Sequence, residues 1–104
     1  MSLKQNQKDV DKWIGQYKLG YFNPLEILAR LTEEVGEVAR ELNHRFGPKK
    51  KKDTEASAHL DEELADVIYT VICLANSQKI DLDKAWKKMM KKLYTRDDKR
   101  WEKK

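Results

Sequence analysis

Two acidic stretches organise this sequence, Glu33-Glu34-Val35-Gly36-Glu37 and Glu62-Glu63-Leu64-Ala65-Asp66. In each stretch two carboxylates stand three residues apart, a glutamate pair in the first and a glutamate–aspartate pair in the second. On a helix this spacing puts both side chains of a pair on one face, with Cβ atoms about 5–6 Å apart. The apolar residues around both stretches recur at helical spacing. The pattern therefore predicts two amphipathic helices, each carrying one acidic pair beside its apolar stripe.

Four carboxylates at the edges of core-facing stripes need a positive partner. At an effective dielectric constant near 20, two like charges about 5 Å apart repel by about 3 kcal/mol. An oxygen-rich cluster of this kind suits a hard divalent cation, Mg²⁺ or Mn²⁺. The sequence thus points to a metal site shared between the two helices.

The alternative is that these acids belong to ordinary solvated helix faces and pair with nearby cations. On the first helix this alternative has support, because Arg30 and Arg40 lie four and three residues from an acid of the pair. On the second helix it fails. No Lys or Arg lies three or four residues from Glu62, Glu63 or Asp66, and only His59 is within reach.

The spacing of apolar residues and helix-ending residues predicts an all-α fold. We predict four helices, over residues 3–18, 24–46, about 56–78, and from near Asp81 to the tail that begins at Thr95. Asn23 and Asp81 are placed to cap the second and fourth helices. The segment 47–57, with Lys49–Lys52, is predicted to be a loop. Because the apolar stripes are wide for so short a chain, we expect a four-helix bundle that is completed by oligomerisation.

Length and composition favour one small domain over residues 1–104, with a basic tail from about 95 to 104. The chain has four Gly and two Pro, too few for the turns of a sheet protein of this length. The single Cys73 allows no disulfide within the chain. No apolar run approaches the roughly 20 residues that span a bilayer. We therefore expect a cytoplasmic protein without a membrane partner. Residues 84–104 hold ten Lys/Arg against three Asp/Glu, which suits an anionic ligand or weak nucleic-acid binding.

The acidic stretches also resemble a known signature. They match the EExxE…ExxD pattern of the MazG-like all-α nucleoside triphosphate pyrophosphohydrolases. The flanking segments Ala29–Thr32, Glu41–His44 and Gly20–Leu25 are similar to those of the small single-domain bacterial members. The resemblance extends from about Val10 to Trp101. It implies an oligomer of helical chains, a homotetramer or homodimer, that hydrolyses (deoxy)nucleoside triphosphates to the monophosphate and pyrophosphate with Mg²⁺.

The resemblance also implies roles for individual residues. The metal ligands of the family fall on Glu34, Glu37, Glu63 and Asp66. The first glutamate of the signature is Glu33, a candidate for orienting or activating water. A downstream Lys and Arg that hold phosphates in the family match Lys92 and Arg96. The asparagine often found near that lysine is absent, since Met90 and Lys91 precede it here.

Nucleobases are commonly held by stacking and a few polar contacts. The sequence offers Trp13, Tyr17, Phe22 and His44 as candidates for binding the base or sugar. Each of them is equally compatible with packing or with an ordinary surface position. Glu33 and the four metal-ligand candidates would carry the reaction, and no nucleophilic Ser or Cys with a His partner is evident.

Two other classes of function fit parts of the pattern. A carboxylate-bridged di-iron bundle needs Glu-x-x-His on two helices, and Glu41–His44 supplies one match. A basic helical oligomer without catalysis could bind nucleic acid or protein through its last helix, although apolar residues there indicate a packed helix. A metal site explains the unpaired acids of the third helix, which the other two classes leave unexplained. We therefore expect a hydrolase that removes non-standard or excess nucleotides from the pool. We do not expect nucleic acid as a partner.

Overall fold

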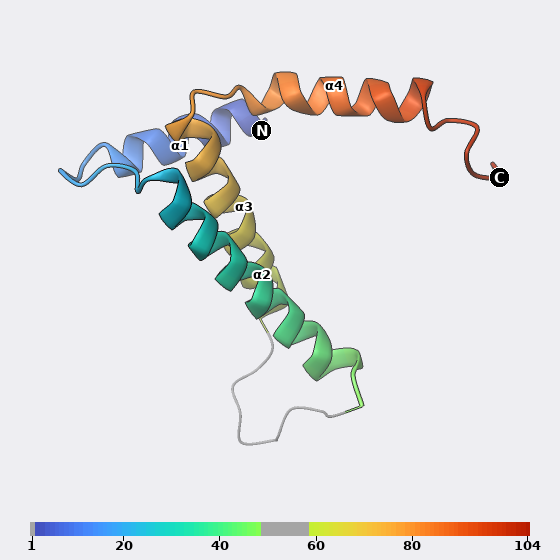
Figure 1. The fold of residues 1–104 in the computed structure, drawn as a ribbon, viewed down its shortest axis with the longest axis horizontal. Helices are drawn as coiled ribbons and strands as arrows, with labels where there is room; N and C mark the ends of the chain where they lie inside the picture. The colour runs from blue at the N-terminus through green and yellow to red at the C-terminus, as the bar shows by residue number, and fades with distance from the viewer. Residues whose placement is uncertain (1, 49–58) are drawn as a thin grey trace.

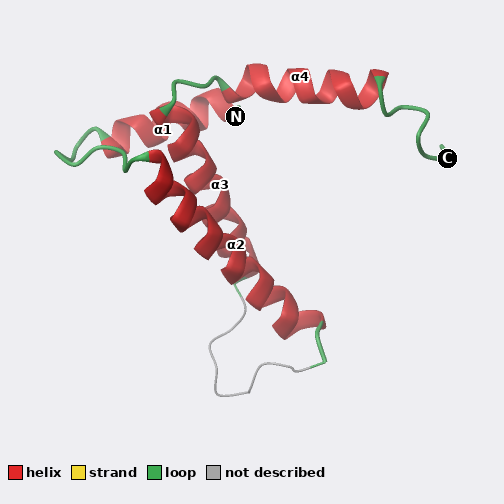
Figure 2. Cartoon of the chain, viewed as in Figure 1, coloured by secondary structure: helices red, strands yellow, loops and turns green. Residues whose placement is uncertain are grey.

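This computed structural model describes residues 2–48 and 59–104, and the regular secondary structure within these ranges is entirely helical. Four helices follow one another along the chain: α1 (Leu3–Ile14), α2 (Pro24–Phe46), α3 (Leu60–Ser77) and α4 (Leu82–Thr95). No strand occurs within the described ranges (Figure 2). The predicted all-α class with four helices is therefore confirmed.

Helix α1 is shorter than the predicted 3–18. It begins after Ser2, whose side chain accepts a hydrogen bond from the Gln5 backbone N–H at 3.1 Å. It ends at Ile14, and residues 15–19 form turns. The glycine at position 15 weakens helix propagation by about 1 kcal/mol relative to alanine. The chain then reverses at Gly20, which adopts a φ of 66° that favours glycine.

Helix α2 has the predicted bounds. The Asn23 side chain accepts a hydrogen bond from the Glu26 backbone N–H at 3.0 Å, and Pro24 occupies the first helical position, where its missing N–H costs nothing. At the other end the N–H of Gly47 bonds to the carbonyl of Asn43 at 2.9 Å. Local capping chemistry therefore sets both ends of the longest helix.

Helix α3 begins at Leu60 among the described residues. The predicted start at 56 and the Lys49–Lys52 loop both lie outside the described residues. The helix ends in a Schellman motif, in which the Ile80 N–H bonds to the Ala75 carbonyl at 2.8 Å and Lys79 takes the left-handed conformation (φ 57°). Asp81 then caps α4, as predicted, accepting from two backbone N–H groups of its first turn.

The helices form an antiparallel pair with two attachments. Figure 1 shows α2 and α3 lying side by side over much of their length, with α1 across one end of the pair. Helix α4 packs against α1 and projects sideways from the same end (Figure 1). The buried apolar side chains of the described residues gather at that end: Ile27, Ile72, Cys73 and Ala75. No residue of α4 is buried.

None of the helices in the described ranges is both long and apolar enough to cross a membrane.

Candidate metal and nucleotide site

Three carboxylates converge between α2 and α3. Oxygen atoms of Glu34, Glu63 and Asp66 all lie within 4.8 Å of one another. Glu34 comes from the middle of α2, whereas Glu63 and Asp66 come from the first two turns of α3. Glu34 and Glu63 are half-buried and Asp66 is exposed, so the cluster is open to solvent on one side. We call these three residues the acidic cluster.

The helix period explains why the cluster forms. Glu63 and Asp66 share a face of α3 because they are three residues apart. The partly buried residues nearest them in sequence, Leu60 and Val67, lie three and four positions from Glu63. On α2, Glu34 lies between the partly buried Leu31 and Val38. Packing of the two apolar stripes therefore brings both acidic edges to the same side.

The pKa of Glu63 reflects desolvation and the closeness of the other carboxylates. Desolvation raises the pKa of the Glu63 carboxyl, and the charges of Glu37, Asp66, Glu34 and Glu41 raise it further. Glu37 stands outside the group of oxygens within 4.8 Å, yet it is the largest of these charge contributions. The carboxylates thus repel one another around Glu63, which is the situation a divalent cation relieves.

Neighbouring cations do not neutralise the cluster. Among the described residues, Arg30 forms no ion pair with Glu34, and Arg40 forms none with Glu37, within 4.0 Å. The Nδ1 of His59 lies 3.8 Å from a carboxylate oxygen of Glu62, which is not a member of the acidic cluster. For Glu34 and Glu37, pairing with these two arginines, which helix spacing allowed, is therefore not formed in the described part of the chain.

The chemistry of the donors fits a hard cation. Every ligand atom is a carboxylate oxygen, and the group contains no sulfur or imidazole. Such a donor set favours Mg²⁺ or Mn²⁺ over softer metals. Glu34, Glu63 and Asp66 would hold the ion. The charge of Glu37 acts on Glu63, one of these three residues. Glu33 directly precedes Glu34 and is exposed.

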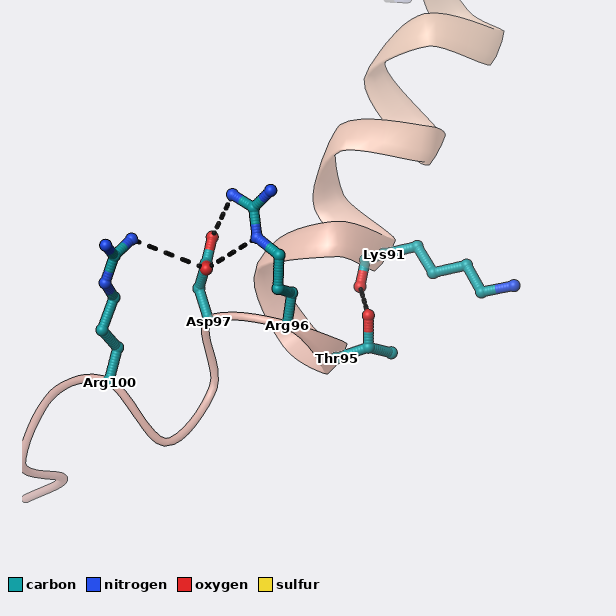
Figure 3. A network of polar contacts seen from close by, with 5 residues as sticks. All are labelled: Lys91, Thr95, Arg96, Asp97 and Arg100. Carbon is teal, nitrogen blue, oxygen red and sulfur yellow. Dashed lines mark hydrogen bonds and ion pairs between the residues drawn. The ribbon is translucent and has the colours of Figure 1, made fainter.

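The predicted phosphate-binding residues lie away from this cluster. Lys92 and Arg96 are at the far end of α4, both exposed. Figure 3 shows the Arg96 guanidinium held by Asp97, with Nε–Oδ1 and Nη2–Oδ2 distances of 3.0 and 3.2 Å. Arg100 approaches the same carboxylate at 3.7 Å. The hydrogen bond from Arg96 and its charge lower the pKa of Asp97.

Asp66 lies eleven residues before the end of α3, about 17 Å along the helix. Lys92 lies ten residues into α4, about 15 Å from its start. Because the two helices diverge from their shared turn (Figure 1), these lengths separate the two groups rather than bringing them together. Within one chain, Lys92 and Arg96 are therefore remote from the acidic cluster.

The candidate base-binding residues are also separated. Trp13 and Tyr17 stack edge-to-face with ring centroids 5.2 Å apart, and both are about half exposed. Phe22 lies in the connector just before α2. His44 lies ten residues beyond Glu34 on α2, about 15 Å farther along the helix. The three aromatic candidates and His44 thus flank the acidic cluster from opposite ends.

A small hollow lies next to the cluster on the side of the aromatic residues. Its walls include Tyr21, Phe22, Arg30 and Tyr69, and its floor includes the buried Ile27 and Thr70. We call it the aromatic hollow. Thr70 donates a hydrogen bond to the carbonyl of Asp66 at 2.9 Å, so the hollow begins one helical turn from a cluster residue. Its volume is about 90 Å³.

Two residues that line this hollow, Arg30 and Tyr69, receive no binding role from the sequence. The sequence offers Arg30 only as a possible ion-pair partner of Glu34, and it assigns no role to Tyr69. A signal for both was present, because Arg30 is four residues before Glu34 and Tyr69 three after Asp66, on the faces that carry the cluster. Trp13 extends the same aromatic surface, with its ring centroid 6.4 Å from that of Tyr69.

The fold and the site define an all-α protein with a candidate metal site between two antiparallel helices. Residues 22–101 match the model of the MazG nucleotide pyrophosphohydrolase domain. The chain belongs to this family and is accordingly a nucleotide pyrophosphohydrolase.

Individual relatives agree with this assignment. The curated protein YpjD of Bacillus subtilis (strain 168), described as uncharacterized, is 52% identical over 103 residues, which is 99% of this chain and 93% of YpjD. The crystal structure of YPJD from Bacillus subtilis superposes with a TM-score of 0.83 at 50% identity, covering 91% of this chain and 97% of that one. A Bacillus-conserved MazG protein, a nucleotide pyrophosphohydrolase, gives a TM-score of 0.80 at 48% identity, covering 92% and 93%.

Proposed function

We propose that this protein hydrolyses (deoxy)nucleoside triphosphates to the monophosphate and pyrophosphate in the presence of Mg²⁺. The observation that carries the proposal is the acidic cluster, whose three carboxylates meet within 4.8 Å with no Lys or Arg paired to them among the described residues. A triphosphate is itself strongly anionic, so it approaches such a cluster only when a cation stands between them. The proposal extends to Mn²⁺ as a substitute ion.

The roles of the residues follow from their positions. Glu34, Glu63 and Asp66 would hold the cation, and Glu37 adds negative charge beside Glu63. When bound, Mg²⁺ supplies charge neutralisation of phosphate oxygens and acidifies water. Glu33 directly precedes Glu34 in α2 and is exposed, and we propose its carboxylate as a candidate to orient a water molecule or accept its proton. Water then adds to the α-phosphorus, the bond to the bridging oxygen breaks, and pyrophosphate leaves.

Lys92 and Arg96 are proposed to bind the leaving phosphates in an assembly of several chains. Helix α4 carries both residues away from the acidic cluster of its own chain, as Figure 1 shows. A neighbouring copy can bring the same residues to the cluster from outside. Cationic side chains there would stabilise the developing charge on pyrophosphate.

The surface of the single chain supports assembly. The accessible surface is 8997 Å², whereas a compact monomer of this mass exposes about 6,100 Å². Obligate oligomers bury about 2,000–5,000 Å² in total, or about 1,000–2,500 Å² on each partner, so the excess of one chain is large enough to supply its share of such an interface. Half-exposed apolar side chains on α2, α3 and α4, such as Leu28, Ile68 and Trp86, supply the surface to be covered. A homodimer or homotetramer is the proposed form.

The aromatic hollow is proposed to receive one edge of the nucleobase. Its volume of about 90 Å³ is smaller than the roughly 150 Å³ that accommodates a benzene ring, so a whole base does not enter it. Phe22 and Tyr69 at the rim offer aromatic faces, and Arg30 offers hydrogen-bond donors. Burial raises the pKa of Tyr69 to about 12, so its hydroxyl stays protonated and can donate a hydrogen bond.

The test is a panel of nucleoside triphosphates with Mg²⁺, in which monophosphate, pyrophosphate and orthophosphate are followed separately. We expect monophosphate and pyrophosphate in equal amounts, with activity lost in EDTA and restored by Mg²⁺ or Mn²⁺. The ranking of substrates would show whether the enzyme removes non-standard or excess nucleotides from the cytoplasmic pool, the role we propose.

Two results would contradict the proposal. Release of orthophosphate and nucleoside diphosphate would indicate a phosphatase. Absence of turnover with every nucleotide would favour the alternative of a basic binding module, which salt-dependent retention on DNA would then test.

A further inference from the structure

A pair of hydrogen-bonded amides joins three helices at the base of α4. Gln7 of α1 is 8% exposed. Its Nε2 donates to the Asn76 Oδ1 and to the Ile80 carbonyl, each at 2.8 Å. Its Oε1 accepts from the Leu82 backbone N–H at 2.9 Å. One side chain thus bonds to the end of α3, to the turn after it and to the first residue of α4.

The second amide is equally occupied. The Nδ2 of Asn76 donates to the Gln7 backbone carbonyl at 3.0 Å and to the Tyr21 hydroxyl at 2.9 Å. The Tyr21 hydroxyl in turn donates to Asp11. Burial, reinforced by the bond to Asp11, raises the pKa of Tyr21 to about 12, so this donor persists throughout the physiological range. Both protons of each amide therefore have acceptors, which leaves a single orientation for each amide group.

Among the described residues of a single chain, little else holds α4. The helix packs against α1 alone to any substantial extent, and none of its residues is buried. Its first turn follows Lys79, which is in the left-handed conformation. The direction of α4 therefore depends on the bonds that Gln7 makes on both sides of this turn.

We propose that Gln7 and Asn76 are positioning residues: their paired amides set the direction of α4 and thereby place Lys92 and Arg96 for phosphate binding. The inference rests on the function proposed above. A tilt of about 10° at Leu82 moves Lys92, about 15 Å along the helix, by about 2.5 Å. Displacements of about 1 Å in a positioned group can cost about 10²-fold in rate, so a small loosening has a large effect on turnover.

The test compares Gln7→Met with Gln5→Met. Gln5 lies on the same helix, but its side chain is exposed and bonds only to Asp9 of α1, so it controls for loss of an amide. We expect Gln7→Met to raise both KM for the Mg²⁺–triphosphate and the inhibition constant of pyrophosphate at least about tenfold. Inhibition by the nucleoside monophosphate and the Mg²⁺-dependent rise in Tm should stay at wild-type values, because the cluster and the aromatic hollow are untouched.

Hydrogen exchange supplies a readout that does not depend on turnover. In Gln7→Met the Leu82 amide loses its acceptor, and we expect its exchange to accelerate relative to Gln5→Met. If Gln7→Met does not fold, Asn76→Ala replaces it. That variant keeps the bonds from Gln7 to Ile80 and Leu82 but loses the bond to Tyr21 of the aromatic hollow. Its readout is therefore the inhibition constant of pyrophosphate, for which we expect a smaller rise than in Gln7→Met.

The outcomes separate the two proposals. Wild-type protein without turnover contradicts the proposed function. Active wild-type protein whose KM and pyrophosphate inhibition match those of the Gln7 or Asn76 variant overturns this inference alone. A variant that weakens monophosphate, pyrophosphate and metal binding equally also overturns it, because the amides would then support the fold in general.

Discussion

At the scale of single residues, Glu63 has the most crowded electrostatic surroundings in the acidic cluster. Four other carboxylates act on it, from its own helix and from α2. A carboxylate in this position is destabilised when the site is empty and stabilised when a cation is bound. The same residue therefore links metal binding, protein stability and catalysis.

Removing one ligand charge should abolish turnover without unfolding the helices. We expect Glu63→Gln and Asp66→Asn each to lower kcat/KM at least about 10³-fold, equivalent to about 4 kcal/mol of transition-state stabilisation. Far-ultraviolet circular dichroism should show unchanged helicity. Glu62→Gln is the matched control, because Glu62 is adjacent and exposed but faces His59. Full activity in Glu63→Gln or Asp66→Asn would show that the replaced residue is not a metal ligand needed for turnover.

The pH dependence of metal binding follows from the same carboxyl. The pKa of Glu63 is raised in the folded protein, so at pH values between the unfolded and the folded pKa the metal-free folded state holds a proton that the unfolded chain releases. Its stability contribution is greatest below the unfolded pKa and is lost as pH rises through the folded pKa. Bound Mg²⁺ favours the ionised form instead. We expect Mg²⁺ to raise Tm by several degrees at about pH 8 and by much less at about pH 5.

Thermal melts with and without Mg²⁺ at both pH values measure this effect. In Glu63→Gln the difference between the two pH values should shrink. A larger Mg²⁺ effect at the lower pH would contradict the assignment of Glu63 as a ligand.

At the scale of elements, capping residues decide where α2 and α4 begin. Asn23 satisfies a backbone N–H that the first turn of α2 would otherwise leave without an intrahelical partner. Asp81 does the same for two N–H groups of α4. These contacts span no more than three residues, which explains why the sequence predicts them.

Loss of the α2 cap should cost stability but not chemistry. We expect Asn23→Ala to lower the free energy of unfolding by about 1 kcal/mol per chain, with kcat near the wild-type value. Asn43→Ala is the control, since Asn43 lies within the same helix and only its backbone carbonyl is engaged there. Urea denaturation at a fixed protein concentration measures both variants. Equal stability of the two would mean that the cap contributes nothing.

The turn after α1 shows the limit of local reasoning. Apolar residues continue at helical spacing through Tyr17, which predicted a helix to about 18, yet the helix ends at Ile14. Gly15 follows Ile14, and the chain reverses at Gly20 (φ 66°) and leads back to the start of α2 (Figure 1). Apolar periodicity alone therefore does not decide where a helix ends when glycines interrupt it.

At the scale of the whole molecule, a single chain is not compact. Its radius of gyration is 17.4 Å, against about 13 Å for a compact chain of this length. Helix α4 accounts for part of the difference, since it projects from the α2–α3 pair (Figure 1). An extended helix with exposed Trp86 and Leu93 is the arrangement expected of a chain that packs against its own copies.

A charge placed among the exposed apolar side chains of α4, such as Trp86 and Leu93, should disrupt the proposed assembly. We expect Leu93→Asp to shift the protein toward smaller species in light scattering coupled to size-exclusion chromatography, and to lower activity in proportion. Lys91→Gln is the control, because Lys91 is exposed on the same helix and its replacement buries no charge. A wild-type protein that is already monomeric, or a Leu93→Asp variant that assembles normally, would contradict the proposal.

Much of the acidic cluster could be predicted from helix spacing. Glu34, Glu63 and Asp66 come together as expected, because each pair has a helical period and both pairs border apolar stripes. Glu37 belongs to the same charge environment but lies outside the group of closest oxygens. Helix spacing alone does not determine how one helix is rotated against its neighbour, and that rotation selects which carboxylates converge.

The sequence by itself determined that there are four helices, where α2 and α4 are capped, and the two acidic pairs, because these depend on interactions between residues at most four positions apart. Only the tertiary structure decided which acids meet, that Tyr69 and Arg30 border a hollow beside them, and that α4 carries Lys92 and Arg96 away from its own cluster. Those outcomes depend on contacts such as Gln7 with Asn76, which are 69 residues apart. Such contacts form only when whole helices pack, so no local sequence pattern predicts them.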